Sequence, residues 1–268
     1  MINQATAIIS ENAVIGNNVH IGEFSVIEDG VIISDDVYID NHVVIKSGTF
    51  LGKGTKVHSF AVLGSAPQDL SYNDEETFLI VGENCVIREH VVINSGSIKE
   101  DLKTIVGNNC YLMSGVHVGH DCKLGDNIVI GPNSAFGGHC HVQNNAFIGG
   151  NVGVHQFIRI GMGALVGGAV GVRRDIIPFA LVNNKGLLGA NLIGLKRDGI
   201  DNKTLRTFFV PIFKQLMQSD IPLTEVIKGL ENSENAYIQE IHKFLKAPSK
   251  RSIPVSYTHL TLPTNREV

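Results

Sequence analysis

The chain has 268 residues, which is enough for one large domain or two modest ones. Its 22 Lys and Arg against 26 Asp and Glu give a formal net charge of −4, so we expect no nucleic-acid partner. No apolar run approaches a membrane span, and the first residues lack the basic start and apolar core of a signal peptide. Four cysteines are too few for a disulfide framework. We therefore expect a cytoplasmic protein with no integral membrane association.

A six-residue period runs through two thirds of the chain. From Ile9 to Leu63 every sixth residue is Ile, Leu or Val, which makes ten positions in a row. The period resumes at Val81 and again, one residue out of phase, from Val106 to Val172. Neither an α-helix nor a simple alternating strand has this period.

The period predicts a mainly β fold in which each hexapeptide forms a short strand and a corner. Three hexapeptides complete one triangular coil, so residues 18 positions apart stack about 4.8 Å from each other in a parallel β-helix. Glycine often follows the inward aliphatic residue, as at Gly52 and Gly131, and we expect it to ease each turn because it lacks a Cβ atom.

The period also divides the chain. Residues 1–185 are interpreted as the β-helix, with two polar insertions at about 65–78 and 94–104 that must loop outward. Residues 186–253 are interpreted as a small C-terminal α-helical domain. Residues 254–268 fit neither pattern, and we interpret them as a foreign or disordered tail.

Helical apolar spacing appears over residues 201–218, 222–230 and 235–245. The charge also changes along the chain. Residues 1–193 hold 11 basic and 18 acidic side chains, net −7, whereas residues 194–251 hold 10 and 7, net +3. The basic balance of the second part favours an acidic partner.

The cysteines stand two residues before aliphatic positions of the repeat, in a slot that is otherwise Ala, Ser, Val or Thr. They are Cys85, Cys110, Cys122 and Cys140. We expect them to be buried, reduced and inert, rather than nucleophiles or metal ligands.

Five of the 11 histidines gather in a short stretch of the repeat. They are His117, His120, His139, His141 and His155. The 18-residue spacing places His120, Gly138 and Gln156 in one column, so we expect a strip of imidazoles along one edge of the prism. Neutral imidazole is a general base near pH 7, and Asp121 beside His120 can fix its tautomer.

Two chemistries fit this strip. In acyl transfer, His120 deprotonates a hydroxyl or an amine and the N–H of Gly138 stabilises the oxyanion. In the alternative, three histidines hold zinc, as in carbonic anhydrases built on hexapeptide prisms. The paired ligands of those carbonic anhydrases are usually spaced His-x4-His, whereas this sequence has His-x2-His and His-x-His. We therefore expect no metal. A purely structural solenoid is a third reading, but it leaves the histidines, loops and helices unexplained.

Five motifs, in order over residues 1–253, resemble the acyl-carrier-protein–UDP-N-acetylglucosamine O-acyltransferase family. They are Gly64-Ser-Ala-Pro-Gln-Asp-Leu70, His117-Val-Gly-His-Asp-Cys122, Gly137-Gly-His139, Val154-His-Gln-Phe157 and Asn191-Leu-Ile-Gly-Leu-Lys-Arg197. The resemblance implies a left-handed β-helix and a homotrimer with sites between neighbouring prisms. It implies no metal or diffusible cofactor.

The implied reaction transfers a 3-hydroxyacyl chain from acyl carrier protein to the 3-hydroxyl of UDP-N-acetylglucosamine, the first step of lipid A synthesis. By resemblance, His120 is the general base, Asp121 orients it, and the N–H of Gly138 binds the oxyanion. Six further positions match residues that bind the sugar nucleotide: Asp69, His117, His139, Gln156, Asn191 and Arg197.

Two positions bear on substrate choice. Gly168 matches the residue that closes the acyl groove and acts as a ruler, and as a glycine it should admit a long chain. Ser71 stands where many family members have Lys, which leaves a 3-amino sugar open as the acceptor. The alternative function is a sugar acetyltransferase that uses coenzyme A on the same prism.

Overall fold

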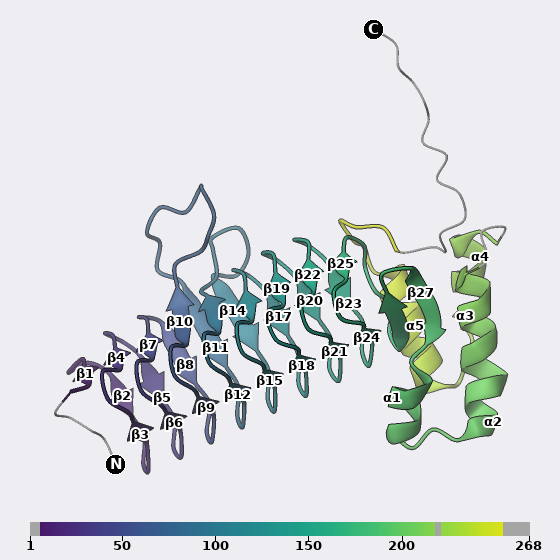
Figure 1. The fold of residues 1–268 in the computed structure, drawn as a ribbon. Helices are drawn as coiled ribbons and strands as arrows, with labels where there is room; N and C mark the ends of the chain where they lie inside the picture. Colours follow the sequence, from purple (N-terminus) through teal and green to yellow (C-terminus); the bar gives the residue numbers. More distant parts are fainter. Residues whose placement is uncertain (1–5, 218–220, 254–268) are drawn as a thin grey trace, which may run out of the picture.

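The computed structural model describes residues 6–217 and 221–253, and the predicted tail at 254–268 lies outside them. The chain forms a left-handed parallel β-helix followed by helices at one end of the prism, which confirms the predicted fold class (Figure 1).

Three sheets form the sides of the prism. The nine-stranded sheet contains, in order, β1 (Ile8–Ile9), β4 (Val26–Ile27), β7 (Val44–Ile45), β10 (Val62–Ser65), β13 (Val92–Asn94), β16 (His117–Val118), β19 (Ala135–Phe136), β22 (Gly153–Val154) and β25 (Gly171–Val172). The eight-stranded sheet contains β2 (Val14–Ile15), β5 (Ile32–Ile33), β8 (Thr49–Leu51), β11 (Phe78–Val81), β14 (Lys103–Val106), β17 (Lys123–Leu124), β20 (His141–Val142) and β23 (Arg159–Ile160). The ten-stranded sheet contains β27 (Gly186–Ala190), β26 (Ala180–Asn183), β24 (Leu165–Val166), β21 (Phe147–Ile148), β18 (Val129–Ile130), β15 (Tyr111–Leu112), β12 (Val86–Ile87), β9 (Lys56–Val57), β6 (Tyr38–Ile39) and β3 (His20–Ile21).

The register follows the 18-residue coil. Ile27 pairs with Ile45 in parallel, and both side chains are buried in the prism. The two insertions form the connections 66–77 and 95–102, which leave the prism at the same corner, between the nine-stranded and eight-stranded sheets.

Gly52 and Gly131, which follow aliphatic positions, have a different role from the one predicted, whereas Gly64 after Leu63 does adopt a positive φ of 79°. Gly52 and Gly131 are not among the residues with positive φ, so they do not ease a left-handed turn. A Cβ at Gly52 would lie 2.4 Å from the carbonyl carbon of Gly82, and one at Gly131 would lie 2.4 Å from the nitrogen of Gly150. Glycine is needed because adjacent coils approach closely at this point.

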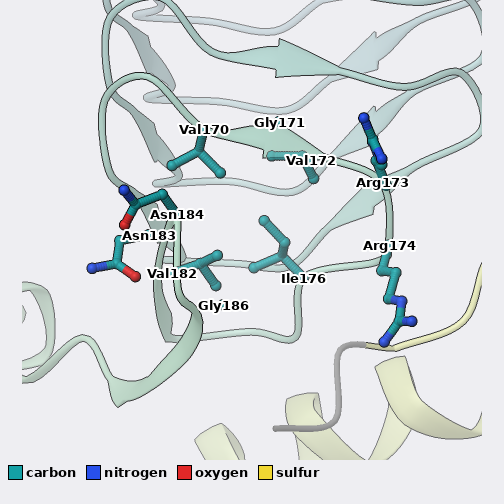
Figure 2. A pocket seen from close by; sticks show the side chains of 10 residues that line it. All are labelled: Val170, Gly171, Val172, Arg173, Arg174, Ile176, Val182, Asn183, Asn184 and Gly186. Carbon is teal, nitrogen blue, oxygen red and sulfur yellow. The ribbon is translucent and has the colours of Figure 1, made fainter. Parts of the chain in front are cut away.

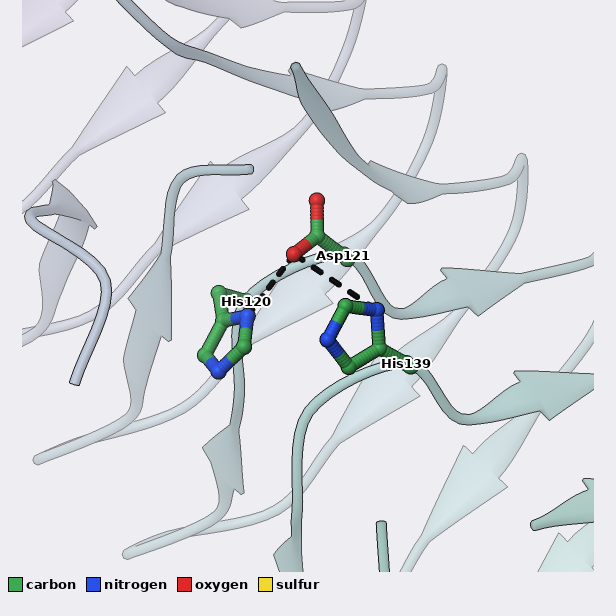
Figure 3. Close-up of side chains that lie close together, drawn as sticks. All are labelled: His120, Asp121 and His139. Carbon is green, nitrogen blue, oxygen red and sulfur yellow. Dashed lines mark hydrogen bonds and ion pairs between the residues drawn. The ribbon is translucent and has the colours of Figure 1, made fainter. Parts of the chain in front are cut away.

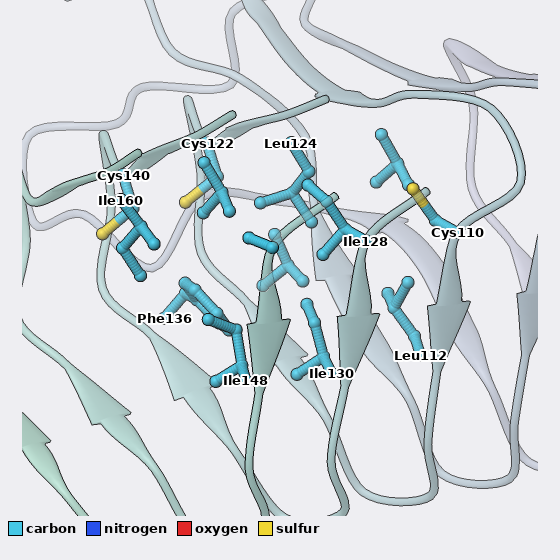
Figure 4. Close-up of a cluster of buried hydrophobic side chains, with 14 of the residues drawn as sticks. Cys110, Leu112, Cys122, Leu124, Ile128, Ile130, Phe136, Cys140, Ile148 and Ile160 are labelled. Atoms are coloured by element: carbon cyan, nitrogen blue, oxygen red, sulfur yellow. The ribbon is translucent and has the colours of Figure 1, made fainter. Parts of the chain in front are cut away.

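All four cysteines are buried and free, as predicted. Figure 4 shows Cys110, Cys122 and Cys140 among the aliphatic side chains that fill the prism. Burial raises the pKa of the Cys122 thiol, which keeps it protonated and inert.

The chain after the prism contains five α-helices and one π-helical turn within the described residues. They are α1 (Leu192–Arg197), α2 (Asn202–Thr204), η1 (Leu205–Phe209), α3 (Val210–Met217), α4 (Leu223–Leu230) and α5 (Ala236–Lys246). Phe179 of the last coil contacts the rings of Phe209 and Tyr237 edge to face, so the helices pack against the end of the prism.

Two local features differ from the sequence prediction. The single helix expected over 201–218 contains a π-helical turn, because Pro211 has no N–H to continue the regular α-helical bonds and Val210 bonds back to Leu205. Residues 186–190, expected in the helical part, form β27, which pairs antiparallel with β26.

Candidate active site

The predicted column lies on the corner between the nine-stranded and eight-stranded sheets, which we call the histidine edge. Val118, Phe136 and Val154 pair in register, so the second residue after each falls in one column: His120, Gly138 and Gln156. The third residue after each is Asp121, His139 or Phe157, and all three have φ between 60° and 65°. The same positive φ recurs at other corners of the prism, as at Asn127 and Asn145, so it belongs to the turn of each coil and does not by itself mark the site.

His120 and Asp121 form a close pair (Figure 3). The Nδ1 atom of His120 lies 2.7 Å from Oδ2 of Asp121, and both residues are buried. The carboxylate accepts a hydrogen bond from Nδ1–H, which leaves Nε2 with the lone pair of the neutral ring. The pair is therefore arranged as a base and its orienting acid.

The second insertion holds Asp121 in place. The carboxylate accepts hydrogen bonds from the backbone N–H of Ser97 at 2.7 Å and from its hydroxyl at 2.6 Å. The N–H of Asp121 donates to the hydroxyl of Thr104 at 2.8 Å. Burial alone would raise the pKa of Asp121, but the hydrogen bonds from His120 and Ser97 outweigh it and lower the pKa below its ordinary value of 3.8.

Gly138 lies against the imidazole of His120. A Cβ at this position would lie 2.6 Å from both Cε1 and Nε2 of His120, so any larger residue would displace the ring. Within the described residues the N–H of Gly138 donates no hydrogen bond, although the residue is buried. A free N–H beside Nε2 is suited to an oxyanion.

His139 completes the cluster. Its ring stacks on Phe157 with centroids 4.4 Å apart, and it meets His120 edge to face at 4.9 Å. Its Nδ1 lies 3.0 Å from Oε1 of Glu100. His117 is half-buried in the strand before His120, where burial first and the charge of His120 second lower its pKa and favour its neutral form.

The strip is less exposed than the sequence suggested. The side chains of His120 and His139 are only 11% and 5% exposed to solvent, because the second insertion covers them. His155 and Gln156, one coil further on, remain exposed.

Asp69, in the first insertion, is tied to the second insertion by an ion pair. Its Oδ2 lies 2.5 Å from Nζ of Lys99, and its Oδ1 accepts from the N–H and hydroxyl of Ser71. These contacts, that of Lys99 foremost, hold the pKa of Asp69 well below its ordinary range. An ammonium therefore stands at this carboxylate although residue 71 is serine.

Three predicted residues do not join this cluster within one chain. Asn191 and Arg197 line a separate cavity of about 160 Å³ with Phe147 and Leu165 of the ten-stranded sheet. The side chain of Asn191 caps α1 by accepting from the N–H of Gly194. Gly168 stacks on Gly150 at the corner between the ten-stranded and nine-stranded sheets.

Sequence reasoning missed the residues that hold the cluster, namely Ser97, Lys99, Glu100 and Thr104. The only signal for these four was their place in the polar interruption of the repeat at 94–104, one coil before the histidines. That position predicted a loop near the site but not which side chains turn inward.

The same cluster offers atoms that could meet at a metal ion. Nδ1 of His120, Oδ2 of Asp121 and Nδ1 of His139 lie within 4.8 Å of one another. However, Asp121 and Ser97 already bond through the same carboxylate, and His139 directs its Nδ1 to Glu100. The 2.7 Å contact between His120 and Asp121 is a hydrogen bond, whereas Nδ1 of His139 lies 3.7 Å from Oδ2 of Asp121. The cluster therefore fits proton transfer better than a zinc centre.

The chain is similar to known acyltransferases over most of its length. Residues 12–47 and 103–138 match the bacterial transferase hexapeptide family, and residues 175–254 match the second domain of UDP-N-acetylglucosamine O-acyltransferase. The acyl-[acyl-carrier-protein]–UDP-N-acetylglucosamine O-acyltransferase of Aliarcobacter butzleri is 40% identical over 93% of this chain and 96% of its own. That of Campylobacter concisus is 31% identical over 94% and 96%.

Solved structures agree with the sequences. The UDP-N-acetylglucosamine acyltransferase of Francisella novicida superposes with a TM-score of 0.92 at 31% identity, covering 96% of this chain and 95% of its own. That of Campylobacter jejuni gives 0.88 at 34% identity, covering 95% and 99%. No helix of the described part of this chain has the length and apolarity needed to cross a membrane.

Proposed function

The chain belongs to the acyl-carrier-protein–UDP-N-acetylglucosamine O-acyltransferase family, and from this premise we propose that it transfers a 3-hydroxyacyl chain from acyl carrier protein to the 3-hydroxyl of UDP-N-acetylglucosamine. This is the first step of lipid A synthesis. The observation that carries the proposal is the 2.7 Å contact between His120 and Asp121 beside the free N–H of Gly138.

In the proposed mechanism Nε2 of His120 takes the proton of the sugar 3-hydroxyl as its oxygen attacks the thioester carbonyl. The tetrahedral intermediate places its oxyanion at the N–H of Gly138. Asp121 stabilises the imidazolium that forms. When the intermediate collapses, the C–S bond breaks, and the departing thiolate takes the proton from His120, which restores the neutral base.

Six residues are proposed to hold the nucleotide sugar. Asp69, His117, His139 and Gln156 line or border the histidine edge, and their hydroxyl- and amide-binding groups suit a sugar. Asn191 and Arg197, in the separate cavity, are proposed to hold the nucleotide. The side chain of Asn191 already accepts from the N–H of Gly194 and donates to the carbonyl of Gly163. One carbonyl lone pair and one amide proton are left to bind the nucleotide.

We also propose that the protein works as a homotrimer. His120 and Gly168 lie on different corners of one prism, so a substrate that reaches both must run between two copies. A cytoplasmic location is proposed as well, since all four thiols are free.

The test is a comparison of donors. Purified protein with UDP-N-acetylglucosamine should form an acylated sugar nucleotide from 3-hydroxyacyl-acyl carrier protein and little from acetyl-coenzyme A, as measured by mass spectrometry of the product. Preference for coenzyme A thioesters would favour the alternative sugar acetyltransferase. A parallel assay with the 3-amino sugar nucleotide identifies the acceptor.

A further inference from the structure

Residues 247–253 leave the end of α5 and return to the histidine edge; we call them the C-terminal strap. Their anchor is the fully buried Asp175, whose backbone N–H donates to the carbonyl of Ser252 at 3.0 Å. Its Oδ2 accepts from the hydroxyl of Ser249 at 2.6 Å and from Nε of Arg159 at 2.7 Å. The strap is therefore fixed to the prism immediately beyond the catalytic cluster.

The strap places Arg251 against the predicted column. Nε of Arg251 donates to the carbonyl of Gln156 at 3.1 Å, and Nη2 lies 2.7 Å from Nδ1 of His155. Because arginine has only donors, Nδ1 of His155 must be the acceptor, which requires a neutral ring. Two of the five N–H groups of the guanidinium are used in this way. Across residues 6–217 and 221–253 no carboxylate pairs with Arg251, so its charge and three donors stay available.

Two more cations stand beside Arg251. Nζ of Lys250 lies 4.0 Å above the ring of Phe157, and this exposed lysine has no ion pair within the described chain. Val172 pairs with Val154, which brings Arg173 next to His155. Figure 2 shows Arg173 and Arg174 on one side of a cavity of about 320 Å³, with Asn183 and Asn184 on the other. We call Arg173, Lys250 and Arg251 the cationic rim.

The cationic rim adjoins the catalytic cluster through Phe157 and Gln156. Phe157, beneath Lys250, stacks on His139, and Gln156, bonded to Arg251, belongs to the column of His120. Arg159 shows how an arginine on this edge is neutralised when it serves structure alone, since its partner is the buried Asp175. The rim has no such partner in the described residues, and unpaired cations at the edge of a site are suited to a ligand anion.

We propose that the cationic rim binds a phosphate group of a bound substrate. The planar fork of Arg251 matches two phosphate oxygens, while Lys250 and Arg173 add charge. The identity of the substrates rests on the proposed function, in which both carry phosphate: a phosphodiester on the pantetheine arm of the carrier and a diphosphate on the nucleotide sugar. Both substrates would therefore present phosphate oxygens to the cationic rim.

The test measures Arg251→Gln, Lys250→Gln and Arg173→Gln in the full chain, with Lys243→Gln as a matched control on the exposed end of α5. KM is determined for a 3-hydroxyacyl-phosphopantetheine thioester, for the phosphate-free pantetheine thioester and for UDP-N-acetylglucosamine. Equilibrium binding of 4′-phosphopantetheine against pantetheine, and of UDP against uridine, is measured alongside. Size-exclusion chromatography and thermal unfolding show whether each variant is folded. If Arg251→Gln does not fold, Lys250→Gln and Arg173→Gln still test the proposal.

Arg251→Gln should weaken the phosphate-bearing ligand about tenfold, the loss expected for a charge-assisted hydrogen bond, and leave its phosphate-free counterpart unchanged. A change confined to phosphopantetheine assigns the rim to the donor, and a change confined to UDP assigns it to the acceptor. Equal changes with and without phosphate, or no change in any variant, would overturn the proposal. If the wild type makes no product, the proposed function fails, and the binding measurements still decide the cationic rim.

Discussion

The hydrogen bond between His120 and Asp121 determines which imidazole nitrogen can act as a base. With Nδ1 directed to the carboxylate at 2.7 Å, Nε2 is left beside Gly138, so a reacting hydroxyl would meet the base while the thioester carbonyl oxygen meets the free N–H. The carboxylate is fixed in turn by Ser97, so the geometry of the base depends on three side chains rather than one.

We expect Asp121→Asn to lower kcat by about 10²–10⁴-fold, because an amide cannot stabilise the imidazolium or hold the required tautomer. Asp101→Asn is the control, since the one ion pair of this exposed carboxylate among the described residues is with Lys123. Steady-state kinetics on the folded proteins decide the outcome. An Asp121→Asn enzyme with a third of wild-type turnover would remove Asp121 from the mechanism.

The same carboxylate should make stability depend on pH. Its pKa is below 3.8 when folded and near 3.8 when unfolded, so the unfolded chain binds more protons between these values. Its stabilising contribution is fully present above 3.8 and is lost as the pH falls through the folded pKa. The gap in unfolding free energy between wild type and Asp121→Asn should be constant from about pH 7 to 5 and narrow below 3.8. Urea unfolding at a series of pH values measures it, and a gap that stays constant down to pH 2 would contradict the account.

Lys99 contacts the binding loop from another part of the chain. Its ammonium pairs with Asp69, next to Ser71, the position at which the family resemblance implies a lysine. We expect Lys99→Ala to raise KM for the sugar nucleotide about fivefold with little change in kcat, since the ion pair is partly exposed and orients a binding carboxylate. Lys103→Ala, an exposed cation in β14, is the control. Adding Ser71→Lys to Lys99→Ala should restore KM. If Lys99→Ala leaves KM unchanged and Ser71→Lys has no effect on it, Lys99 does not contribute to binding the sugar nucleotide.

Among the elements, the connection 95–102 does most to build the site. Ser97, Lys99 and Glu100 reach Asp121, Asp69 and His139 respectively. The column of His120, Gly138 and Gln156 could be predicted because the 18-residue register fixes which residues stack. The inward side chains of the connection could not, because no periodic pairing constrains an insertion and its conformation depends on contacts made after the coils form.

The strands show the same contrast. Inward positions were predicted from the period alone, including the four cysteines. The role of the glycines was not, because the clash that excludes a Cβ at Gly52 comes from Gly82 on the next coil rather than from the residue's own φ. Distance between coils is a property of the stacked prism that a single hexapeptide does not reveal.

Cys122→Ala tests whether the thiols serve packing alone. Cys122 directly follows Asp121 in the sequence. Its thiol is fully buried and donates to the carbonyl of Gly137 at 3.2 Å. We expect kcat/KM to stay within about twofold of wild type and stability to fall by about 1 kcal/mol, a typical cost for losing a small buried group. Thermal unfolding and donor kinetics are measured together. A folded Cys122→Ala protein without activity would show that the thiol takes part in the chemistry.

At the scale of the whole molecule, the prism separates the groups that one acyl chain must reach. The base lies on the histidine edge and Gly168 on the corner between the ten-stranded and nine-stranded sheets, so the proposed groove is complete only between two prisms. A rigid stack of coils suits this arrangement, because corner positions 18 residues apart keep a fixed spacing along the groove.

Gly168→Met should therefore change the acyl-chain preference rather than the chemistry. The residue is exposed and an added Cβ would lie 3.2 Å from the carbonyl oxygen of Gly150, a tight contact that a small shift relieves, so the variant should fold. Each buried methylene contributes about 0.8 kcal/mol, so a side chain that displaces about four carbons of the acyl group should lower kcat/KM for the longest donors by roughly 10²-fold. Donors with shorter chains should keep their rates. Gly229→Met on α4, where no atom lies within 4 Å of an added Cβ, is the control. Kinetics with carrier-bound donors of graded length give the profile, and if it is the same in Gly168→Met and wild type, Gly168 does not set the chain length.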